Sequence, residues 1–457
     1  MYKRQALRYA NLKNSVPLSV TRTYVKYVDV GKYPQTRRSF QVTRCNQCSS
    51  APCVPACPTS AMFARHDGII DFDKSSCIGC KACIAACPYD AIFINPEDKS
   101  AEKCNFCAHR IDIGLEPACV VVCPTQAILV GDMTDPLSEV NQIIARQPVT
   151  VRKPEKDTRP KVHYKGATNM TLDPLAAKRP EGGLFMWSEQ GNDPHKVTSG
   201  HPRSNSSSAA AVLSYDVPHN APWDWRVSLY TWTKSISAGA YIVPGMLLLL
   251  GHMDVNSPVW TIATPLFGLT LLAVTGVLLI WDLEHPERFY MIFTRSQWNS
   301  WLVRGGIIIG AYGLVLFIHA LLSWSGEHAL LSNIAWAGLP VAVMTSVYTA
   351  YLFAQAKARD LWQNPLLPAH LLVQSVVAGA GVVCLYAKFL DDVSMEILTS
   401  IFVGSSAIHL LMILGELSLP HASAHGRMAV EEILSGKFRG FFWLSIVLAS
   451  VGLLAPW

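Results

Sequence analysis

Apolar and polar positions are divided unevenly along this chain. After about residue 226, long apolar runs follow one another, and most exceed the roughly 20 residues that a helix needs to cross a bilayer. Only a helix satisfies its own backbone hydrogen bonds in lipid. We therefore predict an all-α polytopic membrane bundle over residues 222–457 with about seven spans: 227–251, 258–281, 301–324, 330–354, 366–390, 395–416 and 440–456. The last run is short, so an eighth helix is absent, lost or supplied elsewhere.

The first 130 residues have a different pattern, with short apolar runs between cysteines and turn-forming residues. The stretch SAMFARHDGIIDFDKSS holds two short β-prone runs around Asp67 and Gly68. An Asp-Gly pair between such runs favours a tight hairpin. Three similar segments, CPTSAMF, CPYDAIF and CPTQAIL, form an internal repeat.

Residues 131–221 are rich in proline, serine and charge. Such composition predicts an extended, solvated linker. Phe185, Met186 and Trp187 are costly to leave in water, so we expect part of this segment to lie on a partner or on the neighbouring domain.

The composition supports a membrane portion, because only 16% of residues are charged and 50% are hydrophobic, whereas about a quarter are charged in soluble proteins. The net charge of +5, without a dense basic run, gives no reason to expect nucleic acid. The first residues lack the apolar core of a secretory signal and a twin arginine. We therefore expect the cysteines to stay in a reducing compartment, where disulfides are rare.

Twelve of the 13 cysteines form three groups, and Cys384 stands alone as an expected core residue. The groups read CNQCSSAPCVPACP, CIGCKACIAACP and CNFCAHRIDIGLEPACVVVCP. The middle group has the bacterial ferredoxin spacing, in which three cysteines hold one cubane cluster and the fourth reaches a neighbouring cluster. This spacing predicts an α+β ferredoxin-like multi-cluster domain over residues 1–130. We assign one [4Fe–4S] cluster to Cys45, Cys48, Cys53 and Cys87, and a second to Cys77, Cys80, Cys83 and Cys57.

Zinc is the alternative for paired CxxC units. For the first two groups we disfavour it, because the run of four cysteines is specific to paired clusters. The third group has a long insertion and no fourth group with which to exchange ligands. We predict one iron–sulfur cluster there, with three alternatives: an incomplete cluster on three ligands, zinc, or no metal at Cys104, Cys107, Cys119 and Cys123.

The cysteine groups resemble the iron–sulfur subunits of membrane-bound molybdopterin oxidoreductases, such as NrfC and polysulfide reductase B. Asn14 to Pro34 is similar to that family's connection between its first and second groups. The resemblance implies four groups, the second paired with the third and the first with the fourth. It places the first group near residues 1–10, where this chain has Lys3, Ala6 and Ala10 and no cysteine.

Ionisable residues near membrane depth are candidate functional groups. WDLEHPERF, residues 281–289, gathers Asp282, Glu284, His285 and Arg288 at the end of the second run. The alternative is an interfacial anchor whose charges reach the headgroups. Lys234 and His319 are more simply read as bundle-facing residues, and the histidines form no obvious pair for haem.

His409 and Glu416 are seven residues apart, which places them on one face of the sixth predicted helix. They are candidates for passing protons or for bracing a pocket. These roles, like those of the cluster ligands, are predicted from the spacing of the residues along the sequence.

WDLEHPERF, GELSLPH and YDVPHNAPWDW resemble stretches of the NrfD-like polysulfide reductase membrane subunits. That resemblance implies a quinone site close to the iron–sulfur partner. Our hypothesis gives Asp282 and His285 the proton and hydrogen-bonding role, with Arg288 stabilising developing negative charge.

The loop charges predict the orientation. With seven spans, one side carries most of the basic residues and the other has Lys388; the first set is Arg288, Arg295, Arg304, Lys357, Arg359, Arg427, Lys437 and Arg439. The positive-inside rule then places the iron–sulfur domain on the cytoplasmic face of a bacterial or archaeal plasma membrane.

Together these patterns predict the electron-transfer and quinone-reacting subunit of a multi-subunit respiratory oxidoreductase in membrane lipid. No Gly-rich nucleotide loop or nucleophile arrangement is visible, so a partner would perform substrate chemistry. The family resemblance implies that this partner is a molybdopterin-type catalytic subunit. One alternative is a component of an alternative complex III that passes electrons from quinol to cytochrome c. Another is a proton-translocating or anchoring module with a degraded cluster relay.

Overall fold

The computed structural model describes residues 9–17, 20–30, 34, 37–167, 172, 222–390, 393–419, 421 and 423–454. The chain divides into two compact units, Met1–Pro222 and Trp223–Trp457. Phe185, Met186 and Trp187, together with Lys3 and Ala6, lie outside the described residues.

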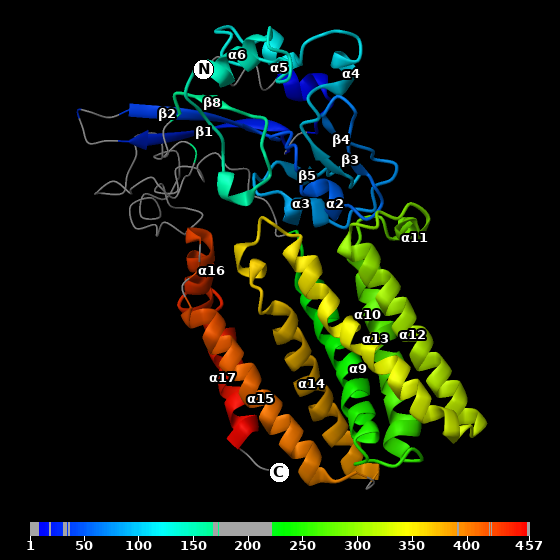
Figure 1. Ribbon diagram of the computed structural model, residues 1–457. Helices are drawn as coiled ribbons and strands as arrows, with labels where there is room; N and C mark the ends of the chain where they lie inside the picture. The colour runs from blue at the N-terminus through cyan, green and yellow to red at the C-terminus, as the bar shows by residue number, and fades with distance from the viewer. Residues whose placement is uncertain are drawn as a thin grey trace. The chain divides into compact units, whose positions relative to one another are not determined.

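The first unit is built from antiparallel two-stranded hairpins and short helices (Figure 1). Asp67 and Gly68 lie in the turn of the second hairpin, where Gly68 takes φ +79°. The hairpin predicted at this position is therefore confirmed. The hairpins are β1 (Thr23–Val30) with β2 (Arg37–Arg44), β3 (Met62–Ala64) with β4 (Ile70–Phe72), β5 (Ile92–Ile94) with β6 (Ala101–Lys103), and β7 (Val149–Thr150) with β8 (Tyr164–Lys165).

Short helices lie between these hairpins and hold several of the cysteines. The first two repeat segments each run from a Cys-Pro pair into a strand, β3 or β5, whereas Ile128 in the third lies in a bend. The third copy of the repeat therefore lacks its hairpin. The helices are α2 (Cys53–Ala56), α3 (Ala82–Ala86), α4 (Ala108–Ile111), α5 (Ala118–Val121), α6 (Glu139–Arg146) and the 3₁₀ turn η1 (Pro154–Lys156).

Residues beyond 130 pack onto the cysteine groups. The backbone N–H of Ser49 donates to the Arg159 carbonyl (2.9 Å), and the Lys161 N–H donates to the Asn46 carbonyl (2.9 Å). The Tyr164 hydroxyl donates to the Val42 carbonyl (3.0 Å). The iron–sulfur unit thus continues past the sequence boundary at residue 130, and residues 149–165 belong to its structure rather than to an extended linker.

The second unit is helical and forms the part of the protein that is integral to the membrane (Figure 1). Five helices of the described residues are long and apolar enough to span a bilayer, so the expected count of about seven is not confirmed. α9 is long enough but carries Lys234 and several hydroxyl residues, and α17 is short. The helices are α9 (Trp225–Leu249), α10 (Thr264–Trp281) with its π-helical start η4 (Val259–Ala263), η5 (Pro286–Arg288), α11 (Met291–Thr294), α12 (Trp301–Ser325), α13 (His328–Ala354), η6 (Asp360–Gln363), α14 (Leu367–Leu390), α15 (Met395–Ser418), α16 (Ala424–Leu434) and α17 (Arg439–Leu454).

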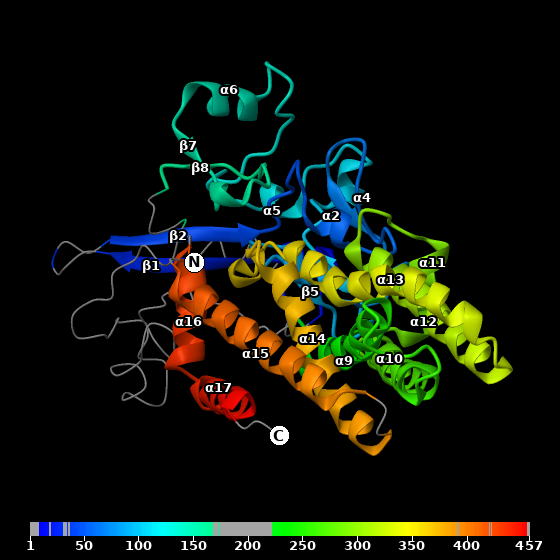
Figure 2. The same ribbon diagram turned by 60° about the horizontal axis from the view of Figure 1, so that its bottom comes forward.

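α9 lies inside this unit and packs against α10, α13 and α14 (Figures 1 and 2). Its contact with α14 is backbone to backbone, because a Cβ on Gly239 would lie 1.8 Å from the Ser375 carbonyl oxygen. Small residues permit such approach, and close packing stabilises helix pairs in lipid.

Lys234 and His319 are both fully buried in the bundle, as predicted, but neither ring nitrogen of His319 has a hydrogen-bond partner among the described residues. The Lys234 ammonium donates to the Ser346 carbonyl (2.9 Å) and to the Thr349 hydroxyl (2.7 Å) on α13. His319 lies beside Trp260, with ring centroids 4.4 Å apart.

Candidate functional site

The three cysteine groups share one backbone turn. Each CxxC pair has a left-handed residue directly before its second cysteine: Gln47 (φ 45°), Gly79 (φ 67°) and Phe106 (φ 61°). This conformation costs a non-glycine residue roughly 1–2 kcal/mol. The surrounding fold must hold it in place, which is typical of functional loops.

The third cysteine of each group lies on a short helix, and the fourth lies at or just beyond its end. Cys53 begins α2 and Cys57 caps it, while Cys83 lies in α3 and Cys87 caps that helix. Cys119 lies in α5, and Cys123 follows that helix. All three groups therefore keep the same local geometry despite the insertion in the third.

One pocket, which we call the first pocket, brings together the four cysteines assigned to the second cluster. Cys77, Cys80 and Cys83 line it with Cys57 from the first group. The backbone N–H of Met62 donates to the Cys57 sulfur (3.4 Å), and that of Ala101 donates to the Cys77 sulfur (3.4 Å). Amides directed at cysteine sulfurs favour the thiolate form that iron requires.

Of the other assigned set, Cys45, Cys48 and Cys53 lie in one buried core, and the partly buried Cys87 packs against it. Burial raises the pKa of the Cys48 thiol to about 11 and that of Cys87 to about 12. Burial also raises the pKa of Cys53, and the nearby Cys45, Cys87 and Cys48 raise it further against the opposing charge of Lys103. These clustered sulfurs, three of them buried and the fourth partly buried, need positive charge to become thiolates, which the irons of a bound cluster would supply.

A single zinc ion fits these cysteines less well. Among the described residues, no three His, Cys, Asp or Glu side chains form a group that could hold one metal ion. A cubane binds its cysteines at four separate corners, so it accepts sulfurs that are too dispersed for one ion.

A separate pocket, which we call the third pocket because it belongs to the third cysteine group, is lined by Cys104, Cys107 and Cys119. Burial raises the pKa of the Cys104 thiol to about 11. The Arg44 guanidinium donates to the Cys119 sulfur (3.2 Å), and the Asn14 amide donates to the Cys107 sulfur (3.4 Å). The sequence did not single out these two donors, because they come from segments 75 and 93 residues away from their cysteines.

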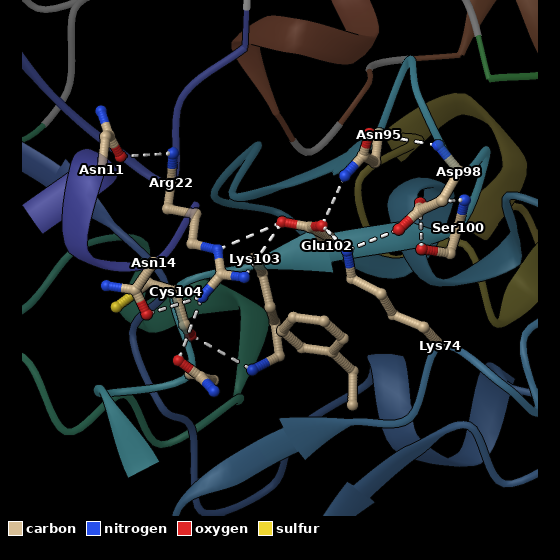
Figure 3. A network of polar contacts seen from close by, with 12 residues as sticks. Asn11, Asn14, Arg22, Lys74, Asn95, Asp98, Ser100, Glu102, Lys103 and Cys104 are labelled. Carbon is tan, nitrogen blue, oxygen red and sulfur yellow. Dashed lines mark hydrogen bonds and ion pairs between the residues drawn. The ribbon is translucent and has the colours of Figure 1, made fainter. Parts of the chain in front are cut away.

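Glu102 lies between Arg22 on one side and Asn95 and Lys74 on the other (Figure 3). Its carboxylate is almost fully buried and accepts hydrogen bonds from Arg22 (3.1 and 3.2 Å) and from the Asn95 amide (2.6 Å). Lys74 forms a further ion pair with it. Arg22 itself lines the third pocket, so this buried network fixes one wall of that pocket.

In the membrane unit, Asp282 caps the end of α10 and is buried. The Arg226 guanidinium of α9 lies 3.5 Å from its carboxylate and also donates to the Trp281 carbonyl (2.7 Å). Asp224 binds the same guanidinium at 2.8 Å. Sequence reasoning missed Arg226, and its position directly after YDVPHNAPWDW was the available signal.

His285 and Arg288 come together around Glu287, which the sequence analysis did not single out. The Glu287 carboxylate lies 3.0 Å from His285 Nδ1 and 3.7 Å from Arg288 Nε. These side chains follow α10 on the 3₁₀ turn η5 and the residue before it.

His409 and Glu416 of α15 both contact His370 of α14. His370 Nδ1 lies 2.9 Å from the Glu416 carboxylate, and the His370 and His409 rings are 4.9 Å apart. His370 was not predicted, because only the packing of α14 on α15 places it there. The three residues form a polar cluster that can hold a proton between a carboxylate and an imidazole.

Paired cysteine pockets on cluster-type turns, joined in one polypeptide to apolar spanning helices, define an iron–sulfur electron-transfer protein integral to the membrane. A 4Fe–4S dicluster domain model matches residues 36–133, and the model described as polysulphide reductase, NrfD, matches residues 214–456. The protein belongs to the NrfD family and carries a 4Fe–4S dicluster domain ahead of its NrfD part.

Curated relatives match about a third of this chain. The B component of polysulfide reductase from Wolinella succinogenes is 44% identical over 153 residues, which are 33% of this chain and 80% of that protein. The B component of tetrathionate reductase from Salmonella typhimurium is 41% identical over 175 residues, covering 36% of this chain and 68% of that protein. The NrfC protein of Escherichia coli is 40% identical over 153 residues, 33% of this chain and 69% of its own.

Proposed function

We propose that this chain relays electrons between a catalytic subunit and the quinone pool, as the electron-transfer and quinone-reacting subunit of a respiratory oxidoreductase. The observation that carries the proposal is the fusion itself, since cysteine pockets of the dicluster type precede an NrfD membrane unit in one polypeptide. When bound, iron–sulfur clusters supply one-electron transfer. A quinone takes two electrons and two protons, so the membrane unit must handle protons.

The cysteine sets lie close enough to one another to form a series of electron-transfer sites. Cys83 of the second set lies close enough to Cys53 of the first set to feel its charge, and Cys104 lies similarly close to Cys45. The first set is therefore the middle station between the second set and the third pocket.

Asp282 is the residue that we assign to the proton step at the quinone. A buried carboxylate at the end of a spanning helix is expensive unless it is paired, and Arg226 pairs with it here. His285, held by Glu287, is assigned a hydrogen bond to a quinone oxygen, and Arg288 stabilises negative charge that develops there. The cluster of His370, His409 and Glu416 is assigned proton transfer or support of the bundle.

Replacing Asp282 tests this role. Asp282→Asn keeps the shape and removes the ionisable group, so we expect quinol oxidation or quinone reduction to fall by about 10²-fold or more. The cluster EPR spectrum and iron content should stay those of the unaltered protein. Glu327→Gln is the matched control, because this exposed carboxylate lies in the loop between α12 and α13. Unchanged quinone turnover in Asp282→Asn would remove this residue from the mechanism.

The printed names of the relatives suggest the partner. They are subunits of polysulfide, tetrathionate and thiosulfate reductases. We propose a molybdopterin-type catalytic subunit that exchanges electrons with the cysteine unit. Affinity purification of the full chain from its native membrane, followed by molybdenum analysis, tests this, and a preparation with clusters but without molybdenum or a second subunit would contradict it.

We also propose that the cysteine unit faces the cytoplasm. The basic residues Arg288 and Arg295 between α10 and α12, and Arg304 near the start of α12, support this through the positive-inside rule. Protease added to inverted vesicles should cleave the described segment 131–167, whereas protease added to intact spheroplasts should not. The reverse pattern would place the unit on the outer face.

A further inference from the structure

The third pocket contains three cysteines where the first pocket contains four. Its lining includes Cys104, Cys107 and Cys119, but Cys123 does not contribute to it. In the first pocket, three cysteines of the middle group are joined by Cys57, the last cysteine of a different group. The first pocket therefore has a fourth sulfur, which comes from another cysteine group, and the third pocket has none.

Cys123 has the same local setting as Cys57. Each follows the end of a short helix, precedes a proline, and has its sulfur 4.0 Å from the hydroxyl oxygen of the threonine two positions later. That residue is Thr59 for Cys57 and Thr125 for Cys123. Cys57 turns away from its own group to complete a neighbouring pocket. The same geometry turns Cys123 away from Cys104, Cys107 and Cys119.

Ala10 lies at the third pocket in place of a fourth ligand. It is buried, and it packs against Cys107, Ala118 and Cys119. The polar neighbours do not substitute for a thiolate: the Asn14 amide oxygen accepts a hydrogen bond from Arg22 (2.9 Å), and Arg44 can only donate. One corner of this pocket is therefore a methyl group.

The pocket nevertheless fits a sulfide-rich group. The Thr23 hydroxyl lines it and is buried, and it has no hydrogen-bond partner among the described residues. A buried hydroxyl without an acceptor costs about 1–3 kcal/mol. Arg44, Asn14 and Thr23 together present donors toward the pocket, and cluster sulfides and thiolates are acceptors.

We propose that the third pocket holds an iron–sulfur cluster through three thiolates only, those of Cys104, Cys107 and Cys119, with Ala10 at the corner that lacks a ligand. The inference rests on the proposed relay for its role, but the ligand set stands on the geometry of the pocket. A cluster bound in this way has one iron without a protein thiolate, and that iron is labile.

Oxidation of the four-iron form releases one ferrous ion and transfers one electron to a one-electron oxidant such as ferricyanide. Three ferric ions and four sulfides remain on the three cysteines. Ferrous ion and one electron from dithionite restore the four-iron form. The paired clusters, with a thiolate on every iron, should not undergo this exchange.

EPR of the purified full chain, treated with ferricyanide under argon, tests the inference. We expect the signal of an oxidised three-iron cluster at about one spin per molecule and about eleven iron atoms, four in each paired cluster and three in the third pocket. Ala10→Cys supplies a thiolate at the empty corner and should abolish that signal while iron rises to about twelve. Ala10→Ser is the matched control and should keep the signal.

Two serine variants separate the possible ligands. Cys119→Ser should remove the three-iron signal, and Cys123→Ser should leave both signal and iron content unchanged. Loss of the third cluster in Cys123→Ser, or a third cluster that resists ferricyanide, would overturn the inference. Neither result bears on quinone reactivity, so the proposed function would fail separately, through the Asp282 measurement.

Discussion

The first and third pockets use the same turn and the same kind of short helix, yet only one of them is closed. Cys77, Cys80 and Cys83 are joined by Cys57, whereas Cys104, Cys107 and Cys119 are joined by Ala10. The difference shows that the CxxC turn is a local property of each group, while completion of a cluster depends on a second group elsewhere in the chain. A cysteine group can keep its shape without a partner group.

Removing one of the four cysteines of the first pocket should have the strongest consequence. In Cys83→Ser, one paired cluster loses a ligand, and its neighbour shares the buried core through Cys57 and Cys87. We expect loss of about four or more irons and of the coupled EPR signals. In Cys119→Ser, about three irons should be lost and the paired signals should persist. Iron and acid-labile sulfide assays with a reductive EPR titration measure both variants, and loss of the paired signals in Cys119→Ser would show that the pockets are not independent.

Features that depend on neighbouring residues could be predicted from the sequence, whereas contacts between distant segments could not. The Asp67–Gly68 hairpin depends on neighbouring residues, so turn chemistry predicted it. Arg44 and Asn14 at the third pocket, and Arg226 beside Asp282, depend on contacts between distant segments. Residue patterns along one helix cannot show which side chain on another helix faces them. For the same reason His370, between His409 and Glu416, was missed.

The expected number of spanning helices is not confirmed, for a related reason. α9 matches the pattern of an apolar run, but it carries Lys234, Ser235 and Ser237 inside the bundle. Lys234 donates to the Ser346 carbonyl of α13, and the Ser237 hydroxyl donates to the Gly268 carbonyl of α10 (2.8 Å). A helix surrounded by other helices can carry polar residues, which lower its mean hydropathy. Length and mean hydropathy therefore do not decide whether α9 crosses the membrane.

Replacing Glu102, whose network fixes one wall of the third pocket, should have the next strongest consequence. Glu102→Gln removes the charge that Arg22 and Lys74 share while keeping the side-chain shape. Breaking a buried ion pair by removing one partner costs about 3–5 kcal/mol, and partial exposure of Lys74 places the effect near the lower end. Loss of cluster absorbance in guanidinium should therefore have a lower midpoint. Lys99→Gln, at an exposed turn residue of the β5–β6 hairpin, is the control and should leave the midpoint unchanged. An unaltered midpoint in Glu102→Gln would show that the network does not stabilise the unit.

Replacing Arg44 changes the charge beside the third pocket without removing a ligand. Burial alone would lower the pKa of its guanidinium, but the neighbouring Cys119 and Cys104 hold that pKa above its usual value, so the group remains a cation beside the third pocket. Positive charge and hydrogen bonds at cluster sulfurs favour the reduced state. Arg44→Gln should therefore shift the midpoint potential of the third cluster to more negative values in an EPR redox titration. The paired clusters serve as the internal control, and an equal shift in all three would point to a general change in the unit.

The weakest consequence should come from the contact between the third cysteine group and the β3–β4 hairpin, which lines the first pocket. The Arg65 guanidinium, near the β3–β4 turn, binds the Asp112 carboxylate directly after α4 (3.2 Å to Oδ2). This hydrogen bond lowers the pKa of Asp112 below its usual value. The contribution is therefore complete above the unfolded pKa of about 4 and is lost as the pH falls through the lower folded value.

At pH 7, Asp112→Asn should raise the hydrogen-exchange rate of the Ile113 and Gly114 amides by about twofold, since exposed ion pairs contribute little. High salt should reduce the difference by screening. The two proteins should become indistinguishable at acidic pH, below the folded pKa of Asp112. Glu116→Gln, whose carboxylate lies in the same insertion but forms no ion pair among the described residues, should exchange as the unaltered protein does. If Asp112→Asn left the exchange rates unchanged at neutral pH and low salt, the insertion would be held by its own backbone turns, and the two cysteine regions would be joined through Glu102 and Arg22 instead.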